Sequence, residues 1–194
     1  MKGTCVPFVN HSIRSLVDLC IAGDEAAMRA LVDRYRDRVF GLCLRMLGQW
    51  HDAEDVAQET FVRALGHLRQ WDRSRDFEPW LFAIAGNRCR TFLSKRARRP
   101  VMQPLVDDLL DQAAGFQQAS QFSEELVLAL NSMRAEHRQA FLLYHQQQLS
   151  YDDIAAALDR PPGTVKTWVH RARRFLITFL SQRQTIEVAE HALR

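Results

Sequence analysis

The sequence of 194 residues lacks the features of metalloproteins, secreted proteins and membrane proteins. Its four cysteines form no C-x-x-C pair, and their spacing offers no zinc framework, so we expect reduced thiols and neither a metal nor a cofactor. No apolar run approaches the ~20 residues that a membrane span needs. Polar residues and a proline interrupt the first 20 residues, which excludes a signal peptide. These absences predict a cytoplasmic protein with no membrane insertion.

The motifs of the common enzyme classes are absent as well. The sequence contains no glycine-rich phosphate loop, no H-E-x-x-H pair and no G-x-S-x-G nucleophile elbow. We therefore predict no catalytic residues and a function in binding. The formal net charge of +3 is too small to identify the partner, so the information must lie in the local distribution of charge.

Proline and glycine are scarce, with six and eight residues, and the chain reads as helical throughout. Asp24 and Asp52 are candidate N-caps, Gly48 a candidate helix end, and Pro79 suits a first turn. The composition changes at Pro100, after which proline, glutamine and a short acidic stretch predict a flexible linker, with a short helix near 105–110. The predicted fold is all-α. It consists of two small helical domains, residues 22–99 and 123–181, joined by the linker 100–122.

The C-terminal domain contains a helix-turn-helix pattern. Ser150 is an N-cap with Asp153 at the third helical position, and a second helix opens at Pro161-Pro162-Gly163. Five cations and no acid lie between Arg160 and Arg174. A tight turn followed by a helix that is basic on its outer face is the geometry of a major-groove reader. The predicted outer face consists of Lys166, Thr167, His170, Arg171, Arg173 and Arg174.

These residues carry a resemblance to a known family. Leu149-Ser150-Tyr151-Asp152-Asp153-Ile154-Ala155, Gly163-Thr164-Val165-Lys166 and His170-Arg171-Ala172-Arg173 closely resemble region 4 of sigma-70 family sigma factors of the extracytoplasmic-function (ECF) kind. In that family the unit reads the −35 promoter element and contacts the β flap of RNA polymerase. The −35 contact residues that the resemblance implies are Thr164, Lys166, Thr167, His170, Arg171 and Arg174.

A second match lies in the N-terminal domain, where Asp52-Ala53-Glu54-Asp55-Val56-Ala57-Gln58-Glu59-Thr60-Phe61 resembles sigma region 2.2. Helical spacing puts an acidic patch with one apolar spot opposite Val56, Ala57 and Phe61, which suits a basic protein partner. In the family this surface binds the β′ clamp helices of core RNA polymerase. The predicted polymerase-binding residues are Glu54, Asp55, Gln58, Glu59 and Val62.

The stretch from Phe77 to Arg99 resembles sigma regions 2.3 and 2.4, with Trp80-Leu81 followed by Ile84-Ala85-Gly86-Asn87. Cations beside aromatic residues suit a single nucleic-acid strand. The resemblance implies a pocket for a flipped base of the −10 element, and promoter DNA as a partner. The implied −10 residues are Trp71, Asp72, Arg73, Ser74, Arg75, Asp76, Asn87, Arg88, Arg90, Lys95 and Arg96. Glu78, Thr91 and Trp168 depart from the family pattern.

The resemblance therefore predicts a promoter-specificity factor for core RNA polymerase, with an anti-sigma factor as a further partner. A linker of 23 residues reaches on the order of 25 Å, which allows the domains to occupy separate promoter elements. A one-component helix-turn-helix regulator that binds duplex DNA alone is the alternative, and a helical adaptor without a DNA role is a third. Neither needs both the acidic patch and a strand-binding face.

Overall fold

The computed structural model describes residues 11–98 and 121–182, and the side chains from residue 125 onward in the second range. The described residues are helical and contain no strand, which confirms the all-α prediction. The predicted short helix near 105–110 and most of the linker 100–122 lie outside the described residues. The elements in chain order are α1 (Ile13–Ile21), α2 (Glu25–Leu47), α3 (Trp50–Gly66), the 3-10 turn η1 (Leu68–Gln70), α4 (Phe77–Arg98), α6 (Gln121–Ser132), α7 (Ala135–His145), α8 (Tyr151–Leu158) and α9 (Pro162–Gln182).

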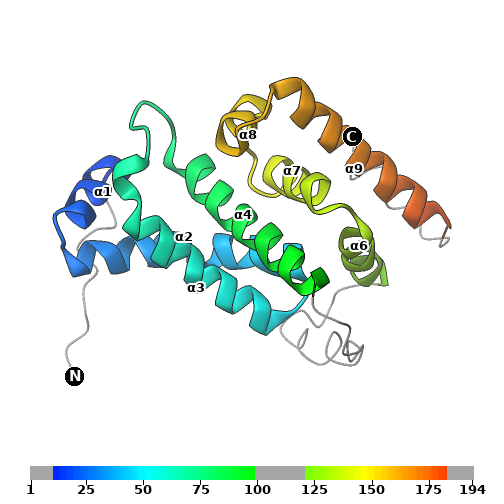
Figure 1. The fold of residues 1–194 in the computed structure, drawn as a ribbon, viewed down its shortest axis with the longest axis horizontal. Coiled ribbons are helices and arrows are strands. Elements are labelled where there is room, and N and C mark those ends of the chain that lie inside the picture. The colour runs from blue at the N-terminus through cyan, green and yellow to red at the C-terminus, as the bar shows by residue number, and fades with distance from the viewer. Residues whose placement is uncertain (1–10, 99–120, 183–194) are drawn as a thin grey trace.

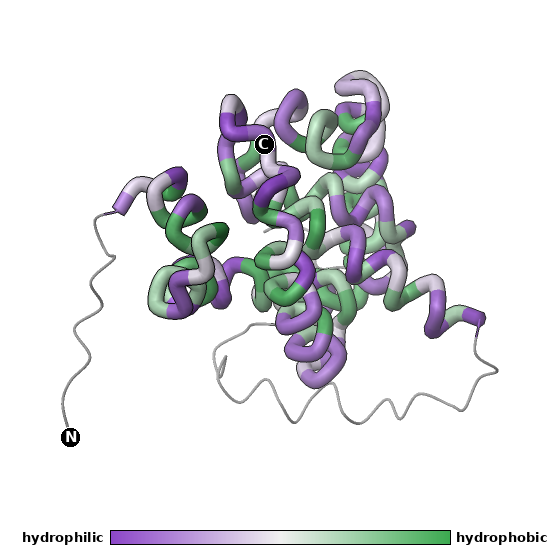
Figure 2. The backbone as a smooth tube through the Cα atoms, turned by 60° about the vertical axis from the view of Figure 1, so that its left-hand side comes forward, coloured by the Kyte–Doolittle hydropathy of each residue, from purple (hydrophilic) through white to green (hydrophobic). Residues whose placement is uncertain are grey.

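The N-terminal domain is a bundle in which α2, α3 and α4 pack together and α1 covers one end (Figure 1). Asp24 caps α2 by accepting a hydrogen bond from the amide of Ala27 at 3.0 Å, and Gly48 ends it with φ at 77°, both as predicted. The predicted cap Asp52 is wrong, because α3 begins two residues earlier and Asp52 lies within its first turn. Apolar and polar residues alternate along the helices, seen as green and purple stretches of the tube in Figure 2, which is the pattern of amphipathic helices.

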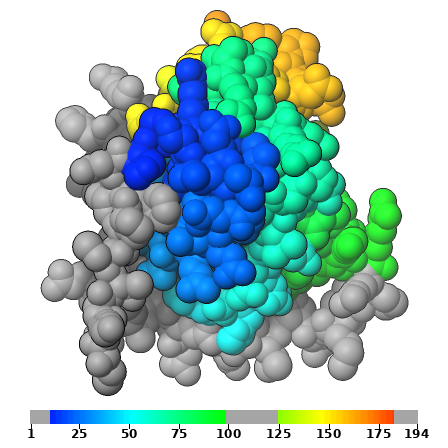
Figure 3. All heavy atoms as spheres, turned by 90° about the vertical axis from the view of Figure 1, so that its left-hand side faces the viewer, coloured from blue at the N-terminus to red at the C-terminus, as the bar shows by residue number. Residues whose placement is uncertain are grey.

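Helix α1 precedes the predicted domain boundary at residue 22 and belongs to the same packing unit. Ser12 caps it, and its Leu16, Val17 and Cys20 are buried in the core. In Figure 3, α1 and α2 in blue cover the face turned to the viewer, above α3 in cyan. The weak sequence pattern of a nine-residue helix does not reveal this contact, which depends on a surface that α2 and η1 create.

The C-terminal domain holds the helix-turn-helix as predicted. The hydroxyl of Ser150 accepts from the amide of Asp153 at 3.1 Å, and the carboxylate of Asp153 returns a contact to the backbone amide of Ser150. Asp159 turns the chain with φ at 52°, and α9 begins at Pro162. Helices α6 and α7 support α9 from behind, because its Val165, Val169 and Leu176 are buried.

The two domains pack against each other in this structure. Helix α4 lies between α3 on one side and α7 on the other, and α2 contacts α6 and α7 (Figure 1). The sequence predicted domains that stand apart on a linker, so this contact is an arrangement that the linker argument did not anticipate. Within the described ranges, no helix is both long and apolar enough to cross a membrane.

Candidate polymerase and nucleic-acid interfaces

The acidic patch on α3 is exposed along one helix face. Glu54, Asp55, Gln58 and Glu59 all face solvent. Val62 lies one turn beyond Gln58, and its 73% exposure is the largest among the large apolar residues that the described part of the chain exposes. The opposite face, with Val56, Ala57 and Phe61, is buried against α2 and α4. An exposed valine surrounded by carboxylates suits a protein partner with cations around an apolar spot.

Two ion pairs join this acidic face to the basic face of α4. The Nε of Arg88 donates to the Glu59 carboxylate at 3.1 Å, and Nη1 of Arg96 donates to the Asp52 carboxylate at 3.1 Å. Both pairs are open to solvent, where such contacts contribute only about 0–1 kcal/mol, so either partner can be exchanged. The sequence analysis assigned Asp52 to neither the acidic face nor the basic face, although it forms one of these ion pairs.

Asn87 lies exposed on α4 with its side chain oriented by a neighbour. The Nη2 of Arg90 donates to the side-chain oxygen of Asn87 at 2.6 Å. The hydroxyl of Thr91 donates to the backbone carbonyl of Asn87 at 2.9 Å. Thr91, one of the departures from the family pattern, therefore satisfies its hydroxyl within the helix and presents no charge. Lys95 lies exposed two turns further along the same helix.

The loop before α4 is ordered by its own side chains. One carboxylate oxygen of Asp72 accepts from the amide of Ser74 at 2.9 Å and from its hydroxyl at 2.7 Å, and these bonds lower the pKa of Asp72. The other oxygen lies 3.4 Å from the Nε of Arg75. Arg73 forms an ion pair with Asp18 of α1, so α1 supports this loop. Asp76 is exposed at the end of the loop.

Trp71 is a correction to the predicted −10 pocket. Its ring is only 5% exposed and packs edge-on against Phe77, with ring centres 5.2 Å apart. The indole N–H finds no hydrogen-bond acceptor among the described residues. A buried ring cannot stack on a base, so Trp71 shapes the loop from beneath, and the exposed −10 candidates are the loop 72–76 and Asn87.

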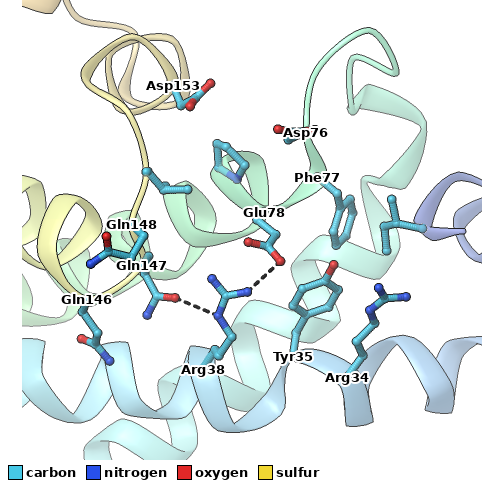
Figure 4. A pocket seen from close by; sticks show the side chains of 13 residues that line it. Arg34, Tyr35, Arg38, Asp76, Phe77, Glu78, Gln146, Gln147, Gln148 and Asp153 are labelled. Atoms are coloured by element: carbon cyan, nitrogen blue, oxygen red, sulfur yellow. Dashed lines mark hydrogen bonds and ion pairs between the residues drawn. The ribbon is translucent and has the colours of Figure 1, made fainter. Parts of the chain in front are cut away.

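Glu78 is explained by a contact with α2. Its carboxylate accepts from Nη1 of Arg38 at 2.7 Å, while the Nε of Arg38 donates to the side-chain oxygen of Gln147 at 3.1 Å (Figure 4). Gln147 belongs to the segment between α7 and α8, so Arg38 bridges the two domains. These groups line a cavity of about 570 Å³ at the domain junction, and Tyr35 lies on its floor (Figure 4).

The outer face of α9 presents most of the residues predicted for duplex DNA. Lys166, Thr167, His170, Arg171 and Arg174 are exposed, and Thr164 is half-buried near the start of the helix. The hydroxyl of Thr167 donates to the carbonyl of Gly163 at 2.8 Å, so it is engaged within the helix in this state.

Arg173 was predicted on this outer face, and that prediction is wrong because its side chain points inward. Its Nε donates to Nε2 of His145 at 3.1 Å, and its guanidinium lies 5.5 Å from the ring centre of Tyr144. Tyr144 stacks on Tyr151 at 4.4 Å, and the ammonium of Lys166 lies 5.8 Å from the ring of Tyr151. Two tyrosines thus hold α9 against α7 and α8.

Trp168, the third departure, packs toward α7. It is half-buried, and its ring lies 6.5 Å from that of His137. Burial, with Arg171 and Arg134 nearby, lowers the pKa of His137. Among the described residues, no cluster of His, Cys, Asp or Glu could hold a metal ion.

The helix-turn-helix with its basic outer face is typical of a DNA-binding protein, and the acidic face of α3 suits a separate protein partner. Residues 31–99 match the family model "Sigma-70 region 2", and residues 123–176 match "Sigma-70, region 4". The chain is 34% identical over 174 residues to the ECF RNA polymerase sigma factor SigW of Bacillus subtilis, which covers 79% of this chain and 89% of SigW. It is also 34% identical to SigE of Mycolicibacterium smegmatis, over 88% of this chain and 68% of SigE.

Solved structures agree with these relatives. CnrH, solved in complex with the cytosolic domain of CnrY, superposes with a TM-score of 0.65 at 26% identity, over 87% of this chain and 97% of CnrH. RpoE of Bartonella quintana, solved with the anti-sigma factor NepR, has the same fold with a TM-score of 0.60 at 23% identity. The chain belongs to the ECF sigma factors of the sigma-70 family. It is a transcription initiation factor that binds RNA polymerase, as the resemblance predicted.

Proposed function

We propose that the three exposed faces divide the work of promoter recognition. The α3 patch binds the β′ clamp helices of core polymerase, the face of α4 with the loop 72–76 holds the −10 strand, and α9 reads the −35 duplex. The observation that carries this assignment is the coexistence of an acidic-apolar face and two separate basic faces on one chain. A one-component regulator would need only the basic face of α9.

The proposal for the −10 element depends on the orientation of Asn87. With its carbonyl engaged by Arg90, the amide N–H₂ of Asn87 is free to donate to an acceptor on a base edge. Lys95 and the guanidinium groups of Arg88 and Arg96 lie along the same helix and can follow the phosphates. The loop 72–76 adds the exposed Arg75 just before the start of α4.

The proposal for the −35 element follows from the position of residues on α9. Residues near the start of a recognition helix reach base edges, whereas those further along meet the backbone. Lys166, Thr167, His170 and Arg171 therefore contact bases, and Arg174, one turn beyond His170, contacts phosphate. The β flap of the polymerase is the proposed protein partner of this domain.

A regulatory partner is part of the proposal. CnrH was solved in complex with the cytosolic domain of CnrY, and this chain matches 97% of CnrH. We extend to this chain a protein partner of that kind, an anti-sigma factor. A factor that acts with polymerase on the chromosome works in the cytoplasm.

Run-off transcription tests the proposal. Core RNA polymerase is incubated with genomic promoter fragments, with and without this chain, and the transcripts are mapped. We expect discrete transcripts that require the chain, and none with a variant reversed at Asp55 and Glu59. Binding of the chain to duplex promoters without polymerase, together with no effect on transcription, would support the one-component regulator instead.

A further inference from the structure

An exposed tryptophan lies at the start of the acidic patch on α3. Trp50 is the first residue of the helix and is 43% exposed. Steps of four residues lead from Trp50 through Glu54 and Gln58 to Val62, so these side chains form one stripe along the exposed side of the helix. The stripe is about 18 Å long. It carries an apolar side chain at each end and polar groups between them.

The ring of Trp50 is held in place from beneath. It packs against the ring of Phe40 of α2, with ring centres 4.5 Å apart and ring planes at 64°. Phe40 is half-buried and packs against the core. A ring that is already fixed loses little conformational freedom when a partner covers it. Trp50 therefore offers a rigid aromatic surface to a partner.

The carboxylate nearest to Trp50 is unpaired. Glu54 lies one turn after Trp50, and side chains at this spacing are neighbours, with Cβ atoms about 5–6 Å apart. Glu59 pairs with Arg88, but neither Glu54 nor Asp55 forms an ion pair or a side-chain hydrogen bond with a described residue. A fixed aromatic ring beside an unpaired carboxylate fits an arginine, because a guanidinium can lie on an aromatic face and pair with a carboxylate at the same time.

The net charge at this end of α3 favours a cation. A helix N-terminus carries about half an elementary positive charge, which by itself would repel one. The first six residues of α3 contain three carboxylates and no lysine or arginine. One of the three, Asp52, pairs with Arg96. The carboxylates of Glu54 and Asp55 remain, and their charge outweighs that of the helix end.

We infer that Trp50 and Glu54 form a subsite for an arginine side chain of RNA polymerase. The inference rests on the proposed function, because the α3 patch brings the polymerase to this end of the helix. The guanidinium lies on the indole ring and pairs with the carboxylate of Glu54, while Val62 meets an apolar group about 18 Å away. Tryptophan and arginine are enriched among the residues that dominate binding at protein interfaces. The subsite thus adds a specific contact to a patch that otherwise attracts by charge.

Substitutions of Trp50 in the full-length chain test the subsite by titration against core RNA polymerase without DNA. Trp50→Leu keeps an apolar side chain against Phe40 but has no aromatic face for a cation. We expect it to weaken the affinity about fivefold, and Trp50→Phe, which retains an aromatic face, to weaken it about twofold. Circular dichroism and thermal unfolding of the free chains check that each variant folds. If Trp50→Leu does not fold, Trp50→Met takes its place.

A double-mutant cycle tests whether one cation contacts both side chains. If it does, Trp50→Leu/Glu54→Gln loses less affinity than the product of the two single losses. Trp50→Leu/Val62→Ala is the matched control, because contacts about 18 Å apart are independent and their losses should multiply. Equal affinities of Trp50→Leu and Trp50→Phe, or losses at Trp50 and Glu54 that simply multiply, would overturn the inference.

The charge reversal Asp55→Lys/Glu59→Lys, measured in the same titration, separates the subsite from the proposed function. A loss of affinity in this variant together with parental affinity in Trp50→Leu overturns the subsite and leaves the proposed polymerase face in place. Parental affinity in both variants overturns the proposed face and the subsite with it.

Discussion

Single side chains determine how the basic faces present their hydrogen-bonding groups. Arg90 holds the carbonyl of Asn87, Ser74 holds the carboxylate of Asp72, and His145 holds Arg173 away from the outer face of α9. In each case a contact within the protein occupies one hydrogen-bonding group, so that only the remaining groups can reach a ligand. Fewer donors and acceptors are therefore available to DNA than the residue types in the sequence indicate.

Asn87→Ala tests the base-holding role. Loss of the amide removes a donor to the unstacked base, whose binding offsets the few kcal/mol needed to unstack it. We expect open-complex formation to fall about tenfold, with polymerase binding and the closed complex unchanged. Permanganate footprinting of the −10 region measures the opening. A variant that melts promoters as well as the parent would place the pocket elsewhere, and the loop 72–76 would be examined next.

Arg171→Ala and Arg174→Ala separate base reading from phosphate attraction on α9. Loss of a base contact costs about 1–3 kcal/mol of discrimination, whereas loss of a phosphate contact weakens all sequences alike and lowers the salt dependence. We expect Arg171→Ala to reduce selectivity across a library of −35 sequences, and Arg174→Ala to reduce affinity uniformly. Equal profiles for both variants would contradict this division.

At the scale of elements, α3 and α4 pack together and carry opposite charge on adjoining faces, where ion pairs join them. Helices α7 and α9 also pack together, through contacts of Arg173 with Tyr144 and His145. The helix-turn-helix, the caps of α2 and the helix end at Gly48 could be predicted, because each depends on residues close together in the sequence. The inward turn of Arg173 and the burial of Trp71 could not, because they depend on Tyr144, His145 and Phe77 arriving from other parts of the chain.

Charge reversal on α3 tests the polymerase patch. In Asp55→Lys/Glu59→Lys, two cations face the cationic surface expected on the partner, and such contacts cost several kcal/mol. We expect affinity for core polymerase to fall about 100-fold in a pull-down titration, with helix content unchanged. Asp33→Lys/Asp37→Lys on α2 is the matched control, since these exposed carboxylates have the same spacing outside the patch. Equal losses in both variants would attribute the effect to net charge.

The contact between α7 and α9 should weaken in acid. Burial, followed by the charge of Arg173, lowers the pKa of His145 in the folded chain. The unfolded chain then takes up a proton near the ordinary histidine pKa of about 6.5, before the folded chain does. The stability is therefore complete above about pH 6.5 and declines as the pH falls below it.

Thermal unfolding followed at about pH 8 and about pH 5.5 measures this decline. His145→Gln lacks the titrating group and should show a smaller loss of melting temperature over the same interval. Part of the decline should remain in that variant, because the pKa of His137 is lowered in the same domain. An identical decline in the parent and His145→Gln would contradict the role of His145.

At the scale of the whole molecule, the notable feature is that the domains meet at all. The composition predicted two domains joined by a linker, but it did not indicate that the domains contact each other. Arg138 and Gln139 lie one after the other in a helix, and nothing in their local sequence shows that both are buried against α2 and α4. The sequence does place a glycine, Gly86, inside a long helix. Its role can be understood only from the structure, in which Gln139 packs against it.

Gln139→Met tests how much the buried amide of Gln139, which has no hydrogen-bond partner among the described residues, costs the folded chain. Methionine has a similar shape without polar atoms, so the substitution removes a penalty of about 1–3 kcal/mol from the packed state. We expect a higher unfolding temperature in differential scanning calorimetry. A lower one would mean that the amide is paired in solution.

If polymerase and promoter DNA bind as proposed, polymerase takes the carboxylate and DNA takes the guanidinium of the pair Glu59–Arg88. A polymerase cation that takes Glu59 releases Arg88, and a phosphate that takes Arg88 releases Glu59. The two ligands therefore assist each other without touching. By thermodynamic reciprocity, whatever factor polymerase adds to the affinity for the −10 strand, the strand adds to the affinity for polymerase. On the proposed assignment, the ion pair between α3 and α4 therefore makes assembly on a promoter cooperative.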